Sequence, residues 1–450
     1  PLLAHGARLA LLALHADLQL RLGGVDVAAT TIAAFQTGAP SIPVALSLSA
    51  IVAASKSDAE AACEKLQRSL EYLDKEMPQS VYAAIGLIGR LMLSRGDVLA
   101  ARGHWILQAN LAGGQDKEPI ELLSRLNTAP EIPLLLKEDH SYADCPADVP
   151  WAGEFNAALK SAGRGAWLAA TESLESLAAK IADQPALVKN MAIFRGWLGN
   201  TKEAVVAWHK YAAMDGVDQD DAVEAEALAQ MLEDKPDDDE IVEVSVLFAI
   251  PDMDKLMEVL LAHRQFSKMS VDPRQLAEEE DQPPPKAVFW MLDRPIPETG
   301  VGLKREEIPS VVADILIYGK QTDRDARLEL VLLKTDDFDD GKQVFKDLAG
   351  DLVGDITEEK TTGSVELIAN ALTWRWHLPN DTPNELRTEL VDAEHREVML
   401  EKWTTLPQKR LDEKSPVDVS GDETYRVRLL AMILLLEIAA DTSSRDFNFD

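Results

Sequence analysis

Five corners along the chain share the same neighbours at the same spacings, and this repetition constrains the fold more than any other feature. The corners are Gly23, Ser57, Gly96, Gly165 and Gly199. Five residues later stands alanine each time: Ala28, Ala62, Ala101, Ala170 and Ala204. Nine residues later stands a bulky apolar residue, and seven residues earlier a small one: Ile32, Leu66, Trp105, Leu174 and Trp208, and Ala16, Ala50, Gly89, Ala158 and Ala192. Because small residues let two helices approach closely and a bulky one fills the groove between pairs, the pattern predicts repeated helix-turn-helix units.

A helix pair of 34 residues with small and aromatic residues at these spacings, as between Gly165 and Gly199, resembles the bacterial type of tetratricopeptide repeat (TPR). Pro40, 17 residues after Gly23, also matches the family, although the other units lack this proline. The resemblance covers residues 1–216 and is degenerate, with an irregular insertion at about 115–150. It implies an α-solenoid of about five helix pairs whose concave face binds a protein or peptide. The residues predicted to face that surface are Asp17, Arg90, Lys189, Asn190, Ile193 and Trp197.

The charge of the chain excludes some classes of partner. The formal net charge is −32, so there is no surplus of lysine and arginine to neutralise nucleic-acid phosphates or an anionic membrane. Residues 215–282 hold 21 acidic and 5 basic residues and thus carry half of that net charge. This segment is either a solvated connector or a docking surface for a basic partner.

Along the rest of the chain, the spacing of the apolar residues changes from that of helices to the alternation of strands, and this change divides it into two parts. Residues 217–285 are predicted to form an acidic helical connector that ends in the proline-rich linker "AEEEDQPPPK" (277–286). Residues 286–450 are predicted to form an α+β domain, in which 311–319 and 326–334 pair as a β-hairpin. Helices are expected at about 342–353, 364–377, 383–403 and 422–440. The predicted fold is therefore mainly α: a TPR-like solenoid followed by a small α+β domain.

The end of the chain resembles a C-terminal module found in some bacterial repeat proteins, which has a W-x3-P-x3-L-x2-K-[ST]-P core. The residues that match it are Trp403, Pro407, Leu411, Lys414, Ser415 and Pro416. Ser415 and Pro416 are expected to start a turn with Leu411 docked beneath it. The resemblance implies no catalytic role.

Signatures of catalysis and of metal binding are weak. There is no phosphate-binding loop, no nucleophile elbow and no HxH or HxxxH pair, and neither Cys63 nor Cys145 has a basic neighbour. The run "DDFDDG" (336–341) suggests a calcium loop, but Phe338 takes a ligand position, so a helix N-terminus explains it better. Residues 372–379 cluster Trp374, Trp376 and His377 in either a hydrophobic contact or an aromatic ligand pocket. No cofactor and no metal are predicted.

We therefore expect a non-catalytic scaffold or adaptor for protein–protein interaction, located in the bacterial cytoplasm. The competing prediction is an enzyme or a small-ligand-binding module in the α+β half, with the repeats as a recruitment arm. A third possibility is a homodimer, formed through an exposed edge of the hairpin or through the leucine-rich helix at 429–438. The expected partner is a protein or peptide, and not a nucleic acid or a membrane.

Overall fold

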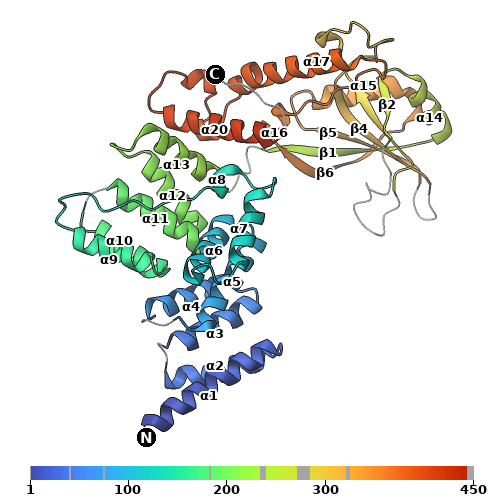
Figure 1. Ribbon diagram of the computed structural model, residues 1–450. Coiled ribbons are helices and arrows are strands. Elements are labelled where there is room, and N and C mark those ends of the chain that lie inside the picture. Colours follow the sequence, from blue (N-terminus) through green and yellow to red (C-terminus); the bar gives the residue numbers. More distant parts are fainter. Residues whose placement is uncertain are drawn as a thin grey trace. The chain divides into compact units, whose positions relative to one another are not determined.

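The computed structural model is mainly helical, with one antiparallel sheet (Figure 1). It describes residues 2–39, 42–73, 77–181, 184–233, 240–270, 284–320 and 325–442. Pro40 and most of the predicted proline-rich linker lie outside these residues. The chain forms two compact units: a helical unit of residues 1–234 and 422–450, and a sheet unit of residues 235–421.

Helix pairs build the helical unit. The helices are α1 (Leu2–Arg21), α2 (Val25–Gly38), α3 (Pro43–Ser55), α4 (Ala59–Glu71), α5 (Gln79–Ser94), α6 (Val98–Ala112), α7 (Glu118–Thr128), α8 (Leu134–Lys137), α9 (Ala152–Ala162), α10 (Trp167–Ala178), α11 (Pro185–Leu198), α12 (Thr201–Ala212), α13 (Gln219–Leu232) and α20 (Arg426–Thr442). The pairs α1–α2, α3–α4, α5–α6, α9–α10 and α11–α12 pack as hairpins, and α20 packs on α13.

Each of the five corners separates the two helices of a pair in the left-handed backbone region. Their φ angles lie between 60° at Ser57 and 85° at Gly96 and Gly165. Glycine adopts this conformation without a steric penalty, which is why it stands at four of the five corners. The alanines five residues later, Ala28, Ala62, Ala101, Ala170 and Ala204, are all completely buried. Trp105 and Trp208, four residues beyond two of them, are 1% and 4% exposed, and a Cβ atom at Gly89 would lie 2.5 Å from the Trp105 indole nitrogen.

After the third pair, some helices pack against helices that are far from them in the sequence. Helix α11 packs on α6, and α10 packs on α4, where Arg68 donates to Glu172 at 2.8 Å. The insertion that separates the third pair from the fourth contributes α7 and α8, which both pack on α6.

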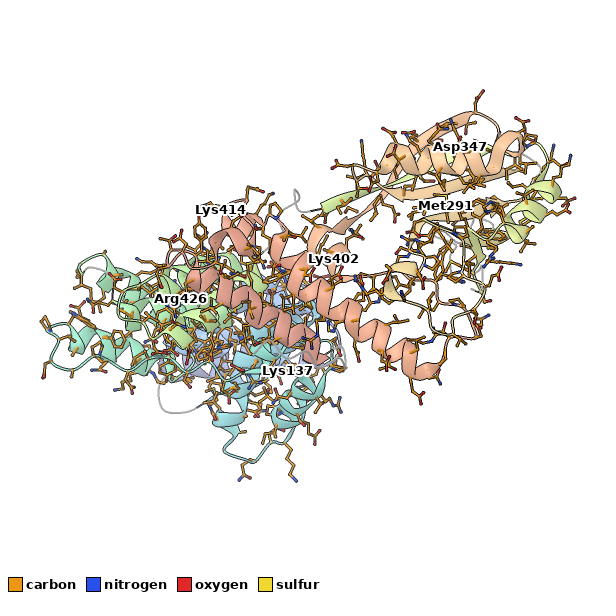
Figure 2. All side chains as sticks on the ribbon, turned by 90° about the horizontal axis from the view of Figure 1, so that it is seen from above. Lys137, Met291, Asp347, Lys402, Lys414 and Arg426 are labelled. Carbon is orange, nitrogen blue, oxygen red and sulfur yellow. The ribbon has the colours of Figure 1, made fainter. Side chains whose placement is uncertain are left out.

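The sheet has six strands in the order β2-β3-β4-β5-β1-β6, and every neighbouring pair is antiparallel. The strands are β1 (Glu240–Ala249), β2 (Phe266–Lys268), β3 (Ala287–Leu292), β4 (Val311–Tyr318), β5 (Arg327–Leu333) and β6 (Ile356–Glu366). Alternate residues of β1, β3, β4 and β5 form a core with Leu256 of α14 (Met253–Ala262) and Phe345 of α15 (Phe338–Ala349). Figure 2 marks Met291 on β3 and Asp347 on α15.

The sheet unit also has 3-10 turns at Arg305–Glu307, Gly350–Leu352 and Lys409–Leu411, and its remaining α- and π-helices follow β6. They are α16 (Leu367–Leu372), α17 (Asn384–Glu397), a π-helical turn (Val398–Lys402), α18 (Trp403–Thr405) and α19 (Pro416–Val419). Ser415 caps α19 through a reciprocal capping box with Asp418, and Leu411 is completely buried. These positions agree with the turn expected from the C-terminal pattern.

The structure differs from the predicted domain limits at three places. Residues 219–232 form a helix that packs on α12, and β1 pairs with β5 and β6 inside the sheet, so the segment 217–285 is not a helical connector. Helix α20 belongs to the helical unit, although its sequence lies beyond the sheet unit. Residues 356–366, which include the start of the helix predicted at 364–377, form β6.

Both surfaces suggested for a homodimer are at least partly covered by other elements of the same chain. The predicted hairpin forms from β4 and β5, but β3 and β1 flank it on both sides, so it has no free edge. In α20, Ala431 is completely buried, and Leu434, Leu435 and Ile438 pack against the core of the helical unit. No helix among the described residues is long and apolar enough to cross a membrane.

Candidate functional site

The inner groove of the helical unit holds a segment of the chain itself. We define the groove by Arg102 of α6, Asn190, Phe194 and Trp197 of α11, and Trp208 of α12. Residues 138–143, the inserted segment, cross it without helix or strand after α8. This segment lies within the predicted irregular insertion at 115–150.

Asn190 binds the main chain of the inserted segment at two points. Its side chain is completely buried. Its Oδ1 atom accepts a hydrogen bond from the Ala143 N–H at 2.6 Å, and its Nδ2 atom donates to the Ala143 carbonyl at 2.9 Å. An amide side chain that satisfies both backbone groups of one residue recognises an extended chain without regard to its side chain.

An aromatic cluster holds the residue that precedes Ala143. The Tyr142 ring lies 5.5 Å from Phe194 and 6.2 Å from Trp197, both in edge-to-face geometry. Trp197 also lies 5.1 Å from Trp167, and a Cβ atom at Gly103 would lie 2.7 Å from its indole ring. The absence of a side chain at position 103 therefore lets Trp197 approach α6 closely.

Arg102 fixes the other end of the inserted segment. Its Nε atom donates to the Glu138 carbonyl at 3.1 Å, its Nη1 atom donates to Asn127 at 2.7 Å, and its Nη2 atom pairs with Asp139. The Arg102 side chain is only 8% exposed, so these partners replace the water that it loses. A ring nitrogen of His140 lies 3.0 Å from the Leu135 carbonyl, and burial lowers the pKa of this histidine.

Two small hollows flank the inserted segment. One, of about 320 Å³, is lined by Leu99, Ile106 and Trp197 together with the segment. The other, of about 210 Å³, is lined by Lys189, Trp208 and Glu224 together with the segment. Open space therefore remains beside the segment on both sides of His140.

The predicted concave-face residues separate into two groups. Asn190 and Trp197 lie in the groove, and Ile193 is buried in the core of the helical unit with 2% exposure. Lys189 lies in the second hollow, 3.6 Å from Asp221 and 5.5 Å above the Tyr211 ring. Burial, followed by the charge of Asp221, raises the pKa of Tyr211 to about 12.

Asp17 and Arg90 belong to other contacts. Asp17 accepts from Arg21 at 2.8 Å on α1, and Arg90 on α5 pairs with Glu118. The partners of these two residues are therefore other side chains, and not Asn190 or the inserted segment. Sequence reasoning missed Arg102, His140 and Tyr142, although an arginine inside the apolar helix 98–112 is a signal that could have been followed.

The sheet unit contains a larger hollow. We call it the split-strand cleft, since it opens where β4 and β5 separate. The last residues that pair between these strands are Asp314 and Val331, although β4 begins at Val311 and β5 continues to Leu333. The cleft encloses about 680 Å³, and residues from both faces of the sheet line it.

Two sequence features adjoin this cleft. The run 336–341 forms the start of α15, with Phe338 9% exposed in the core, and no group of three potential metal ligands occurs among the described residues. Trp376 packs on Leu303, Ile308 and Leu390, in agreement with the interpretation as a hydrophobic contact. His377 lies 6.4 Å from the Trp290 ring, and burial lowers its pKa.

Comparison with protein-family models, with curated proteins and with solved structures finds no match for this chain. The resemblance to TPR proteins thus remains a prediction from the sequence pattern.

Proposed function

We propose that the protein is a non-catalytic interaction scaffold, built on a TPR-like solenoid, that binds an extended segment of a partner protein in its inner groove. The observation that carries this proposal is the two-point contact of the Asn190 amide with the main chain of Ala143. A groove that holds one extended polypeptide in this way has the chemistry to hold another.

The partner segment would replace the inserted segment rather than lie on top of it. Asn190 has one N–H and one oxygen directed at Ala143, so two chains cannot use it in this way at once. The expected partner segment carries an aromatic residue in the place of Tyr142 and a small residue in the place of Ala143. Proteins of the cytoplasm, where we place this chain, supply such segments in flexible regions.

The tethered segment competes strongly because it is part of the same chain. A segment joined by short connections acts at an effective concentration of the order of millimolar. A free peptide therefore binds measurably only when the internal contacts are weakened. Tyr142→Ala is designed to do this, since it removes the aromatic contact and leaves Asn190 in place.

The test uses a fluorescent peptide of residues 134–146, with serine in place of Cys145, and fluorescence anisotropy. We expect the Tyr142→Ala chain to bind this peptide at least about tenfold more tightly than the wild-type chain, because the groove is vacant for a larger fraction of the time. Adding Asn190→Ala to Tyr142→Ala should abolish the gain, and a scrambled peptide is the matched control. Equal weak binding by all three chains would contradict the proposal.

A further inference from the structure

We propose that the split-strand cleft of the sheet unit binds an alkylammonium group, which is an aliphatic chain that ends in a positively charged amine. This inference goes beyond the scaffold function and does not depend on it, because it concerns residues of the sheet unit alone. It rests on the opening between two strands, on the apolar walls and on the arrangement of charge at the rim.

The opening lies within the sheet rather than on its surface. Beyond the pair Asp314–Val331, β4 continues along β3 through Ala313, and β5 continues along β1 through Leu332. The two strands therefore separate while each keeps its other neighbour. A gap held open by paired strands on both sides is preformed, so ligand binding has no free-energy cost for opening it.

The walls of the cleft are apolar and suit a chain of methylene groups. Val312 and Val344 are 40% and 42% exposed, although both are aliphatic residues in regular elements. The other apolar wall residues include Val331, Leu333, Phe338 and Val365. Covering such surface with an aliphatic chain is favourable by roughly 25 cal/mol per Å².

The rim of the cleft is acidic. Five carboxylates line it, from Glu243, Asp293, Asp314, Asp337 and Asp340, whereas Arg375 is the one basic side chain among the described residues of the lining. Arg375 is neutralised, because it donates to both carboxylate oxygens of Asp314 at 2.9 and 2.6 Å. The charge at the rim therefore favours a cation.

The carboxylates differ in whether they already have hydrogen-bond or ion-pair partners. Asp293 accepts from Arg294 at 2.8 Å and from the Ser310 N–H at 2.9 Å, and Glu243 accepts from the Thr362 hydroxyl at 2.9 Å. Asp337 and Asp340 are exposed and have no basic partner among the described residues, since the nearby Lys342 pairs with Asp339 and Glu359. These two carboxylates more than offset the partial positive charge at the start of α15, and are placed to receive the ammonium group.

The ammonium group could come from a free amine or from a lysine side chain of a partner, and the experiment separates these sources. The full chain, with labelled valine and leucine methyl groups, is titrated by NMR with 1,5-diaminopentane and with acetyl-Gly-Lys-Gly-amide. Acetyl-Gly-norleucine-Gly-amide, which has the aliphatic chain without the charge, is the matched ligand control. We expect the methyl signals of Val312, Val331 and Val344 to shift with a charged ligand only.

The matched variants are Asp337→Asn with Asp340→Asn, and Asp347→Asn with Asp351→Asn, which make the same change of charge on and just after α15 but outside the cleft lining. The first pair should weaken binding about tenfold, and the second less than about twofold. Tighter binding of the diamine identifies a free amine as the source, and tighter binding of the lysine peptide identifies a partner protein. Equal shifts with the norleucine peptide, equal weakening by both variants, or no shift with either amine would overturn the proposal.

Discussion

The inner groove of the helical unit and the split-strand cleft of the sheet unit are both hollows, but the chain fills only one of them. In the groove, Asn190 and Arg102 are paired with main-chain groups of the inserted segment. In the cleft, about 680 Å³ stays open and Asp337 lacks a basic partner among the described residues. The buried polar side chains of Asn190 and Arg102 are thus satisfied within the chain, whereas carboxylates at an open rim can remain hydrated until a ligand arrives.

The largest expected effect is at Asn190. Asn190→Ala leaves the N–H and the carbonyl of Ala143 without their partner, and each such loss costs about 1–3 kcal/mol when the group is shielded from water. We expect the helical unit to lose about 2–4 kcal/mol of its free energy of unfolding, measured by denaturant titration with hydrogen exchange to assign the loss to this unit.

Cys145 provides an independent readout of the same change. It lies two residues beyond Ala143 and is half-buried, whereas burial raises the pKa of the Cys63 thiol to about 12. Asn190→Ala should accelerate thiol labelling at Cys145 and leave Cys63 protected. Asn200→Ala is the control, since the Asn200 side chain makes no capping hydrogen bond. If labelling at Cys145 stays as slow as in the wild-type chain, Asn190 does not hold the inserted segment.

The local features of the helical unit could be predicted from the sequence for a physical reason. A left-handed corner needs glycine or a residue that tolerates positive φ, and close helix approach needs a small residue at a fixed distance from it. These requirements act over a few residues, so Gly199, Ala204 and Trp208 carry them in the sequence itself. The alternation of Leu328 and Leu330 in the predicted hairpin is a signal of the same local kind.

The features that define the sites depend on contacts between distant residues. Asn190 meets Ala143 across 47 positions, and the cleft depends on where β4 and β5 cease to pair. In β1, Val244, Val246 and Phe248 alternate into the core, but the surrounding acidic residues led to the prediction of a helical connector. Likewise, nothing local in α20 specifies that it returns to the helical unit and packs on α13.

A second prediction concerns the pH dependence of the stability of the helical unit. His104 of α6 is completely buried beside Trp167, and burial lowers its pKa from 6.5 to about 4. Between these two pH values the unfolded chain binds a proton that the folded chain does not, so stability falls as the pH drops. The loss reaches about 3 kcal/mol at pH 4.

The measurement is the free energy of unfolding of the helical unit at pH 7 and at pH 4.5, in the wild-type chain and in His104→Leu. The variant lacks the titrating group, so the stability of the wild-type chain relative to it should decline on acidification. A difference between the two chains that does not change with pH would show that His104 is not the source of the acid sensitivity.

A third prediction compares two helical glycines. A Cβ atom at Gly103 would overlap the indole of Trp197, whereas a Cβ atom at Gly153 of α9 meets nothing within 4 Å. Gly103→Ala should therefore destabilise the helical unit by about 1–3 kcal/mol, and Gly153→Ala should stabilise it by up to about 1 kcal/mol through helix propensity. Both changes are measured by denaturant titration, and a Gly103→Ala chain that is as stable as the wild-type chain or more stable would mean that the groove wall tolerates movement of Trp197.

The smallest expected effect is at the rim of the cleft. Asp337→Asn with Asp340→Asn removes two exposed carboxylates that have no basic partner among the described residues. The relief of repulsion between the acidic residues and the lost interaction with the start of α15 have opposite signs, so we expect a change within about 0.5 kcal/mol in the sheet unit. Hydrogen exchange of α15 amides measures it. A loss above about 1 kcal/mol would show that these carboxylates already stabilise the fold, as Asn190 does in the groove, and would remove the contrast between the two hollows.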